Sequence, residues 1–263
     1  MAISADGKSW FLINASPDLR AQIEAFPGLH PSPETARNSP ISAVLLTNAD
    51  LDHVLGLFLL RERNRLRVYA PQPIFDIVTR DLRLVEILKP FCRVEWQETS
   101  ADSSTVLLDE SGGPTGLRVR TLPLATKPPP YAAPSSADGV QSVAYEIVDE
   151  RTHGKLLVAP DVAAITPELR LALNAADAVL FDGTFWSNHE FQGVTGKVRT
   201  ADDMGHLTIQ DGSLNVLQPL KACHKIYLHI NNTNPVLNPD SAEYAEVKRA
   251  GIVIGHDGME FEL

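Results

Sequence analysis

The sequence predicts an α/β protein built as a sandwich of two sheets with helices on the outside. Short apolar runs typical of buried strands recur in both halves of the chain, and helical patterns accompany them in both halves. The middle of the chain is rich in strands and has few helices that could connect parallel strands. A doubly wound parallel sheet is the alternative, but the strand-rich middle with its hairpin favours the sandwich.

In the first half of the chain, expected strands and helices alternate. The strands are apolar runs or alternate as RVEWQE does, and they are expected at Lys8–Asn14, Ile41–Leu46, Arg67–Ala70 and Arg93–Glu98. The helices are expected from Pro17-Asp18 to Gly28, at Val54–Arg65, where leucines recur at helical spacing, and at Ile74–Lys89.

The second half begins with strands and ends with helices between strands. Strands are expected at Thr105–Leu108, Leu117–Leu122, Ser142–Asp149, Lys155–Ala159, Ala178–Phe181 and Lys225–Ile230, with two more at the end. Helices are expected after the capping residue Thr166, at Ser213–Lys221 and at Ser241–Ala250. The segment ERTHG is a hairpin signature, and the Pro-, Ala- and Ser-rich segment Lys127–Gly139 predicts a surface loop or lid.

Composition and charge exclude several classes of function. The formal charge of -10 argues against a general nucleic-acid or anionic-membrane surface, because phosphate neutralisation needs an excess of Lys and Arg. The cysteines Cys92 and Cys223 are far apart and indicate neither a disulfide framework nor a thiolate zinc site. No apolar run is long enough for membrane insertion. The negative charge leads us to expect a small partner, and the cysteine pattern a cytoplasmic protein.

Four polar clusters each follow an apolar strand directly. They are NADLDH (48–53), APD (159–161), FDGTF (181–185) and HINNTN (229–234). Strand ends on one rim of a sheet can converge on a single site, and His229 projects where its strand leaves the core. Carboxylates and imidazoles without thiolates suit Zn, Mn or Fe(II), and two histidines with one carboxylate form the arrangement used for oxygen activation at iron.

Each cluster also has a simpler structural explanation. Asp50 and Asp52 fit a solvated turn and helix cap as well as they fit a ligand set, because Asp stabilises a helix N-terminus. His229 alone is more often a hydrogen-bonded core histidine, and Asp182 could merely close a turn at Gly183.

The remaining candidates are weaker. For Asp161 we favour a loop role over metal ligation, and His206 fits a loop residue as well as an acid or base. The other histidines have no clustered partners, so we expect surface roles for His30, His153, His189, His224 and His256.

NADLDH has the spacing of the HxHxDH signature of the metallo-β-lactamase superfamily. Asn48 and Asp50 stand where the two leading histidines fall, and Asp52 and His53 are retained. More narrowly, the chain resembles the PqqB family, the pyrroloquinoline quinone biosynthesis proteins B, along essentially its whole length. The segments that carry this resemblance are NASPDLRAQI (14–23), TNADLDHVLGL (47–57), TLPLATKPPPY (121–131), VLFDGTFW (179–186), MGH (204–206), HINNTNPVL (229–237) and HDGMEFEL (256–263).

The resemblance implies an αββα metallo-β-lactamase-like sandwich in a single domain, residues 1–263. It implies an iron-dependent oxygenase that hydroxylates the tyrosine of a Glu-Tyr precursor of pyrroloquinoline quinone (PQQ). The alternatives are a non-catalytic carrier that transports PQQ or its precursor to the periplasm, and a zinc-dependent hydrolase such as a phosphodiesterase or lactonase. The acidic residues in the signature and the missing third histidine in LPLATK speak against the hydrolase.

The resemblance also implies roles for individual residues. Asp52, His53 and His229 would bind Fe(II), or alternatively Zn(II), with Asp50 as a weaker fourth ligand. Asp182 and His206 would orient the substrate phenol or transfer its proton. The substrate is expected to be a small Glu-Tyr-derived peptide or a PQQ intermediate, and its expected contacts are Lys127, Asn231, Asn232 and Asn234.

Compared with the family, the sequence begins late. The family's N-terminal strand, glycine-rich loop and cysteine-rich zinc knuckle have no counterpart here. We therefore expect a shortened sandwich with an exposed sheet edge, which either a misassigned start or association into a homo-oligomer would explain.

Overall fold

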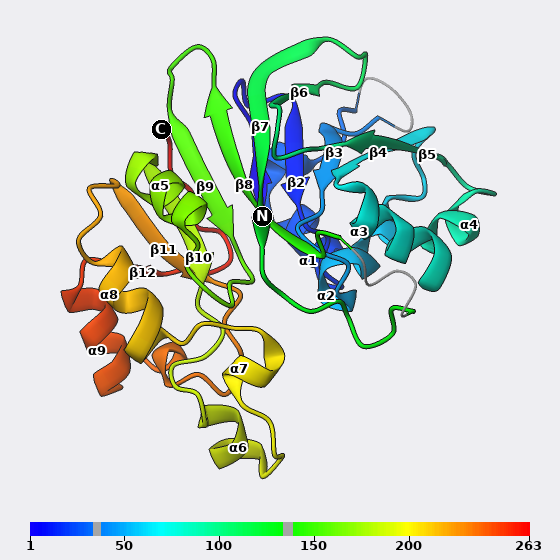
Figure 1. Ribbon diagram of the computed structural model, residues 1–263. Coiled ribbons are helices and arrows are strands. Elements are labelled where there is room, and N and C mark those ends of the chain that lie inside the picture. Colours follow the sequence, from blue (N-terminus) through cyan, green and yellow to red (C-terminus); the bar gives the residue numbers. More distant parts are fainter. Residues whose placement is uncertain (34–37, 134–138) are drawn as a thin grey trace. The chain divides into compact units, whose positions relative to one another are not determined.

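Two structural units make up the chain in the computed structural model, which describes residues 1–33, 38–133 and 139–263 (Figure 1). The first unit comprises Met1–Thr121, Pro128–Ser142 and Asp149–Arg151. The second comprises Leu122–Lys127, Val143–Val148 and Thr152–Leu263. Residues 134–138 of the expected loop Lys127–Gly139 lie outside the described part, and its residues 127–133 form no helix or strand.

The first unit contains a five-stranded sheet in the order β1-β2-β3-β4-β5. Its strands are β1 (Ala2–Ile3), β2 (Trp10–Ile13), β3 (Ile41–Leu45), β4 (Arg65–Ala70) and β5 (Arg93–Glu98). β1 runs antiparallel to β2, and the other neighbours are parallel. β6 (Thr105–Leu108) and β7 (Pro114–Leu124) form an antiparallel pair. The predicted positions of strands β2 to β6 are therefore confirmed.

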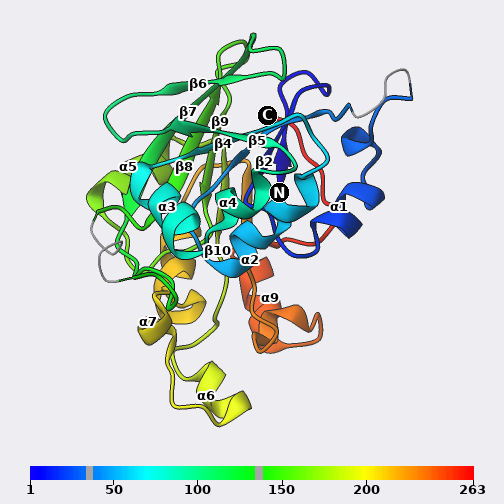
Figure 2. The ribbon, with the colours of Figure 1, turned by 90° about the vertical axis from the view of Figure 1, so that its right-hand side faces the viewer.

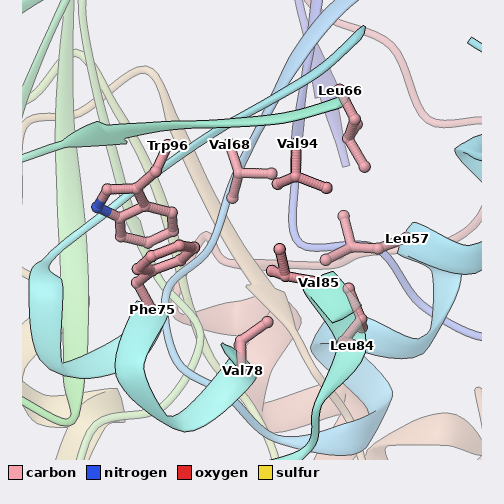
Figure 3. Close-up of a pocket in the computed structure, with 9 residues that line it drawn as sticks. All are labelled: Leu57, Leu66, Val68, Phe75, Val78, Leu84, Val85, Val94 and Trp96. Carbon is pink, nitrogen blue, oxygen red and sulfur yellow. The ribbon is translucent and has the colours of Figure 1, made fainter. Parts of the chain in front are cut away.

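Helices pack on one face of β4 and β5, because apolar side chains alternate along these strands. The helical elements of this unit are α1 (Leu19–Ala25), η1 (Pro27–Leu29), α2 (Leu51–Val54), η2 (Leu55–Leu60), α3 (Gln72–Asp76), η3 (Ile77–Asp81) and α4 (Leu84–Leu88). The helices α3 and α4 lie beside β4 and β5 (Figure 2). Leu66 and Val68 of β4 face the helices, and Trp96 of β5 stacks on Phe75 of α3 with ring centroids 4.1 Å apart (Figure 3). This face is apolar, so it forms a core.

Two helix predictions for this unit were wrong in extent. In the expected helix Val54–Arg65, only Val54 is α-helical, as the last residue of α2; the 3₁₀ segment η2 follows, and Arg65 already begins β4. Gly56 lets η2 lie close to the backbone of Ser16, because a Cβ at position 56 would be 2.3 Å from the carbonyl oxygen of Ser16. The expected helix Ile74–Lys89 breaks before α4, where Arg83 adopts a left-handed conformation with φ 57°.

The second unit contains parallel strands at its centre. β9 (Lys155–Ala159), β10 (Ala178–Asp182), β11 (His224–Leu228) and β12 (Val253–Ile254) are parallel neighbours in that order. β8 (Ser142–Asp149) runs antiparallel to β9, which confirms the predicted hairpin. Only one of the two expected final strands is present among the described residues, because the chain after Ile254 forms turns.

Three helices cover one face of these strands. The helical elements are α5 (Pro167–Ala175), α6 (Glu190–Thr195), α7 (Ala201–Met204), η5 (Ile209–Ser213), α8 (Leu214–Leu217), η6 (Pro235–Leu237) and α9 (Ala242–Arg249). Leu169 of α5, Leu217 of α8 and Val247 of α9 share one core with Phe181 and Tyr227 of the sheet. Alternate residues along these strands face this core. The polar clusters lie at the ends of the strands and in the loops that follow them.

The register of the parallel strands positions the candidate site. Ala159 of β9 pairs with Phe181 of β10, and Asp182 pairs with Leu228 of β11. Parallel neighbours end at the same edge of a sheet. The polar segments that follow β9, β10 and β11 therefore emerge side by side.

Helix lengths also bear on membrane insertion. The longest helix in the described part of the chain, α5, has nine residues, whereas a transmembrane helix needs about 20. The described residues thus contain no helix that could span a bilayer.

Candidate metal centre

Asp182 is the last residue of β10, and its carboxylate is fully buried. Oδ1 accepts hydrogen bonds from the backbone N–H and the hydroxyl of Thr184, at 2.9 and 2.6 Å. Oδ2 accepts from the backbone N–H of Val162 at 2.9 Å and from Nδ1 of His206 at 2.8 Å. Burial is the largest single effect and raises the pKa of Asp182. The charge and hydrogen bond of His206, the charge of His229 and the hydrogen bond of Thr184 together outweigh it and lower the pKa. Four donors thus stabilise one buried anion.

His206 follows a short helix with well-defined ends. Thr200 and Asp203 form a capping box at the start of α7, and Gly205, with φ 85°, ends the helix. The carboxylate of Asp182 can only accept hydrogen bonds, so Nδ1 of His206 carries a proton, and Nε2 of the neutral ring keeps its lone pair. Burial is the largest single effect and lowers the pKa of His206. The charge of Asp182, its hydrogen bond and the charge of Asp161 together raise the pKa above its usual value.

His229 lies one residue beyond the end of β11. The predicted strand Lys225–Ile230 was too long, because His229 adopts a left-handed conformation with φ 58°. Its Nδ1 is 2.8 Å from the hydroxyl oxygen of Thr184, and its ring stacks on that of His206 with centroids 5.6 Å apart. Nε2 of His229 is 3.7 Å from a carboxylate oxygen of Asp161. In this conformation the imidazole of His229 points toward the carboxylate of Asp161 and not into the core.

Asp161, His206 and His229 form a group that could hold a metal ion. One ligand atom of each lies within 4.8 Å of the others. Asp161 is only 5% exposed and follows β9 directly. Two imidazoles and one carboxylate suit Fe(II) or Zn(II), and the set contains no thiolate. From the sequence we favoured a loop role for Asp161 and did not expect it beside His206 and His229. The segment APD nevertheless follows an apolar strand, as the other polar clusters do.

The segment NADLDH joins β3 to α2 within the first unit. Oδ1 of Asn48 accepts the backbone N–H of Asp50 at 3.0 Å, and Nδ2 of Asn48 donates to the Asp50 carboxylate at 2.9 Å. These two bonds fix the orientation of the Asn48 amide. Nδ1 of His53 lies 2.7 Å from the same Oδ1, so this nitrogen is the donor and Nε2 keeps its lone pair.

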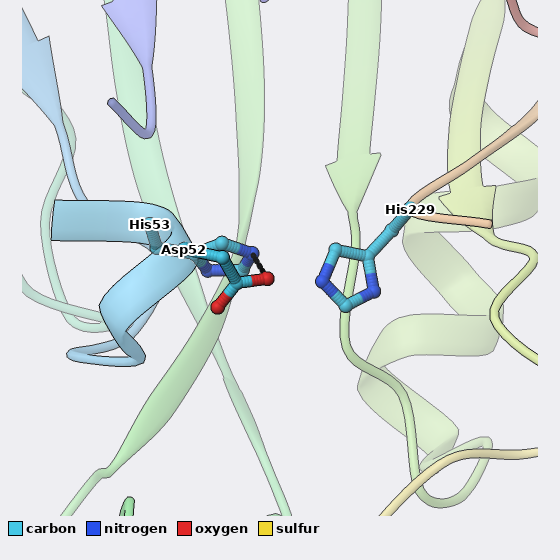
Figure 4. A group of neighbouring side chains, drawn as sticks. All are labelled: Asp52, His53 and His229. Atoms are coloured by element: carbon cyan, nitrogen blue, oxygen red, sulfur yellow. Dashed lines mark ion pairs between the residues drawn. The ribbon is translucent and has the colours of Figure 1, made fainter. Parts of the chain in front are cut away.

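The side chain of Asp50 does not cap the helix α2 as the helix-cap explanation requires. Asp50 is the N-cap of α2, but its side chain makes no capping hydrogen bond. The carboxylate of Asp52 is 61% exposed and 3.9 Å from Nε2 of the buried His53 (Figure 4). Figure 4 also draws His229 at the end of its strand in the second unit. That Asp50, Asp52, His53 and His229 bind one metal ion remains a prediction.

The expected substrate-contacting asparagines have different environments. Asn234 is buried, its Nδ2 donates to the carbonyl oxygens of Gly183 and Thr184, and its Oδ1 accepts the N–H of Val236. These bonds use both amide hydrogens and one lone pair of Oδ1, so Asn234 braces two loops. A substrate contact at Asn234 remains a prediction. Asn232 is exposed, while the backbone N–H of Asn231 donates to Thr184.

Lys127 begins the expected loop Lys127–Gly139, and Tyr131 lies in its first half. Nζ of Lys127 is 3.4 Å from the carbonyl oxygen of Asp203 in the second unit. In the first unit, the hydroxyl of Tyr131 donates to the carbonyl of Ala49, next to Asp50. Burial, followed by the charge of Asp50, raises the pKa of Tyr131. A contact between Lys127 and a substrate carboxylate remains a prediction.

Four of the five histidines expected on the surface are exposed, which confirms the prediction for them. They are His30, His153, His189 and His256. His224 is half-buried, because its ring lies against that of Phe261 with centroids 4.6 Å apart.

Comparison with known proteins places this chain in a family. The model of the beta-lactamase superfamily domain matches residues 9–230. The whole chain aligns with coenzyme PQQ synthesis protein B from Methylococcus capsulatus at 38% identity and from Cupriavidus necator at 37% identity, covering 86% of each relative.

Solved structures agree with this assignment. The crystal structure of Zn²⁺-bound PqqB from Methylobacterium extorquens matches the whole chain and 86% of its own, with a TM-score of 0.88 and 34% identity. A diphosphatase of the PhnP family matches 98% of the chain and 80% of its own, with a TM-score of 0.66 and 20% identity, and shows the fold alone. The predicted metallo-β-lactamase fold of the α/β class is confirmed. The chain belongs to the family of coenzyme PQQ synthesis protein B within the metallo-β-lactamase superfamily, a family with a role in PQQ biosynthesis.

Proposed function

We propose that this protein is an iron-dependent oxygenase of PQQ biosynthesis that hydroxylates the tyrosine ring of a small Glu-Tyr-derived substrate. The observation that carries the proposal is the group of two imidazoles and one carboxylate formed by Asp161, His206 and His229. This donor set is the one used by non-haem Fe(II) oxygenases, which leave coordination positions open. Asp52 and His53 stay predicted ligands on the strength of the sequence resemblance.

Bound Fe(II) would supply the chemistry that activates dioxygen. Hydroxylation replaces a ring C–H bond by C–O–H, so one oxygen atom enters the ring and the other leaves as water. Two electrons must come from an external reductant. The chain's own residues would hold the phenol and carry its proton, and Nε2 of His206 is suited to this because Asp182 fixes the proton on Nδ1.

His206 therefore has two alternative roles within the proposal, as third metal ligand or as carrier of the phenol proton. The metal content of a His206→Gln variant separates them. A ligand role predicts that the variant binds less iron than the wild type. A proton-transfer role predicts full iron content with reduced turnover.

Oxygen consumption provides the direct test. Protein loaded with Fe(II) under anaerobic conditions is mixed with Glu-Tyr, ascorbate and oxygen, and the product is examined for the mass of one added oxygen atom. We expect His229→Ala and His53→Ala to abolish turnover. His189→Ala, at an exposed histidine, is the control and should match the wild type. Equal turnover in all variants would show that the metal assignment is wrong. Stoichiometric PQQ binding that survives removal of the metal, without turnover, would favour the carrier.

A zinc-dependent hydrolase is the second candidate, favoured by the Zn²⁺-bound relative from Methylobacterium extorquens. Zn(II) accepts the same nitrogen and oxygen ligands as Fe(II). This candidate predicts that zinc-loaded protein cleaves a phosphodiester or a lactone with no need for oxygen or reductant. Zinc-loaded protein is therefore assayed with bis(p-nitrophenyl) phosphate in the absence of oxygen. Cleavage under these conditions would favour the hydrolase over the oxygenase.

A further inference from the structure

The hydroxyl of Thr184 lies between a buried carboxylate and a candidate metal ligand. Its oxygen is 2.6 Å from Oδ1 of Asp182, 2.8 Å from Nδ1 of His229 and 2.9 Å from the carbonyl oxygen of His229. Thr184 itself is 5% exposed, so water has little access to these groups. Every one of the three contacts is within hydrogen-bond range.

Counting protons decides which way the bonds run. A hydroxyl has one proton to donate, and its strongest acceptor here is the carboxylate of Asp182, at the shortest distance. If the hydroxyl instead donated to Nδ1 of His229, a lone pair of the Thr184 oxygen would face a lone pair of Oδ1 of Asp182 at 2.6 Å. The carbonyl oxygen of His229 also only accepts, so the single hydroxyl proton goes to the carboxylate or to this carbonyl. In both cases a lone pair of the Thr184 oxygen faces Nδ1 of His229, which must then carry a proton.

We propose that Thr184 is a positioning residue that holds His229 in the Nδ1–H tautomer, so that the lone pair of Nε2 faces Asp161 and a bound metal ion. The role of the metal rests on the proposed function, whereas the tautomer does not. Orientation of a ligand histidine through its second nitrogen is a general device of metal sites. Here a neutral hydroxyl connects the histidine to the carboxylate of Asp182, which holds His206 directly.

The surrounding loops keep this arrangement in place. The carbonyl oxygen of Thr184 accepts hydrogen bonds from the backbone N–H of Asn231 and from Nδ2 of Asn234. The backbone N–H of Thr184 donates to Asp182 as well. These bonds involve only backbone atoms of Thr184, so they survive a change of its side chain. A substitution that removes the hydroxyl alone therefore tests the tautomer without removing the support of the loop.

Two variants isolate the hydroxyl. Thr184→Val keeps the shape of the side chain and removes the hydroxyl, while Thr184→Ser keeps the hydroxyl. ¹⁵N spectra of metal-free protein with labelled histidine, at about pH 8.5 where an ordinary imidazole is neutral, report the tautomer of each ring. The signal of His229 is assigned by its loss in His229→Gln.

We expect the Nδ1–H tautomer of His229 in the wild type and in Thr184→Ser, and a shift toward the Nε2–H tautomer in Thr184→Val. The signal of His206 should stay unchanged in all three, as an internal reference. Zn²⁺ affinity, measured by competition with a chromophoric chelator, should fall about 10- to 100-fold in Thr184→Val and stay near the wild-type value in Thr184→Ser.

Either of two results would overturn the proposal: an Nε2–H tautomer in the wild type, or a Thr184→Val variant with unchanged tautomer and affinity. If Thr184→Val does not fold, the tautomer in the wild type and in Thr184→Ser still decides the question. The spectra need neither substrate nor oxygen. A protein that fails to hydroxylate Glu-Tyr but shows the Nδ1–H tautomer would refute the oxygenase and leave the role of Thr184 intact.

Discussion

Replacing Asp182 by Asn tests how strongly one buried carboxylate stabilises the candidate metal centre. Asn has the same shape as Asp, but one of its two oxygen positions becomes an NH₂ group that cannot accept hydrogen bonds. If the NH₂ takes the place of Oδ2, it meets the backbone N–H of Val162 and the Nδ1 of His206. If it takes the place of Oδ1, it meets the backbone N–H and the hydroxyl of Thr184.

The expected loss follows from these contacts. In either orientation one backbone N–H, which cannot turn away, is left in a buried place without an acceptor, at a cost of about 1–3 kcal/mol. The bonds that remain also lose the strength that the charge gives them. Removal of one partner of a buried ion pair costs about 3–5 kcal/mol. We therefore expect the free energy of unfolding of the metal-free protein to fall by about 2–5 kcal/mol in Asp182→Asn.

Urea unfolding followed by circular dichroism measures this loss. Asp177→Asn is the matched control, because the carboxylate of Asp177 also accepts a backbone N–H, that of Lys155 at 2.9 Å, but is exposed to water. The control should change the free energy of unfolding by less than about 1 kcal/mol. Equal losses in Asp182→Asn and Asp177→Asn would refute the reasoning, because burial and the fourfold hydrogen bonding of Asp182 would then contribute nothing.

Three further predictions concern the second unit. The pKa of Asp182 is lowered in the folded state from its ordinary value of 3.8, so its stabilisation is present above about pH 3.8 and lost as the pH falls through the lower folded-state pKa. Urea midpoints of the metal-free protein between about pH 5 and pH 2 should therefore fall less steeply in Asp182→Asn than in the wild type. The hydroxyl of Thr166 accepts the N–H of Leu169 at the start of α5, so Thr166→Ala should lower the free energy of unfolding by about 1 kcal/mol and Thr166→Ser by much less, measured in urea. The buried hydroxyls of Tyr227 and Ser213 are 2.9 Å apart, so Tyr227→Phe should cost about 1–3 kcal/mol and the double variant with Ser213→Ala should cost less than the sum of both, as a double-mutant cycle would show.

The rim of the second unit could be predicted because strands and polar clusters are local in sequence. An apolar run followed by Asp or His marks a strand and its end without any knowledge of neighbours. The parallel order of β9, β10 and β11 then places the residues after them at one edge. This is why Asp182 and His229, chosen from the sequence, are connected through Thr184.

Asp161 could not be chosen in the same way. Its cluster contains a single polar side chain, and such a residue is common in ordinary loops. What distinguishes it is the approach of His229, 68 positions later in the chain, and that approach depends on the left-handed conformation at His229. Helix lengths failed for a related reason, because the break at Arg83 is a backbone conformation for which the side chain gives no signal.

Asn48 and Asp182 show why the departure from the superfamily signature is not simply a loss of ligands. Asn48 stands where a histidine falls in HxHxDH, and its amide oxygen accepts the Nδ1 proton of His53. Asp182 does the same for His206 directly. In both cases an acceptor on one side of an imidazole leaves Nε2 as the lone-pair donor, and backbone N–H groups fix the acceptor itself. A histidine at position 48 could offer one more ligand but not this amide oxygen. If His53 is a ligand as predicted, the replacement exchanges ligand number for orientation of that ligand. Such a site would suit a metal ion with open coordination positions better than a fully occupied pair of zinc ions.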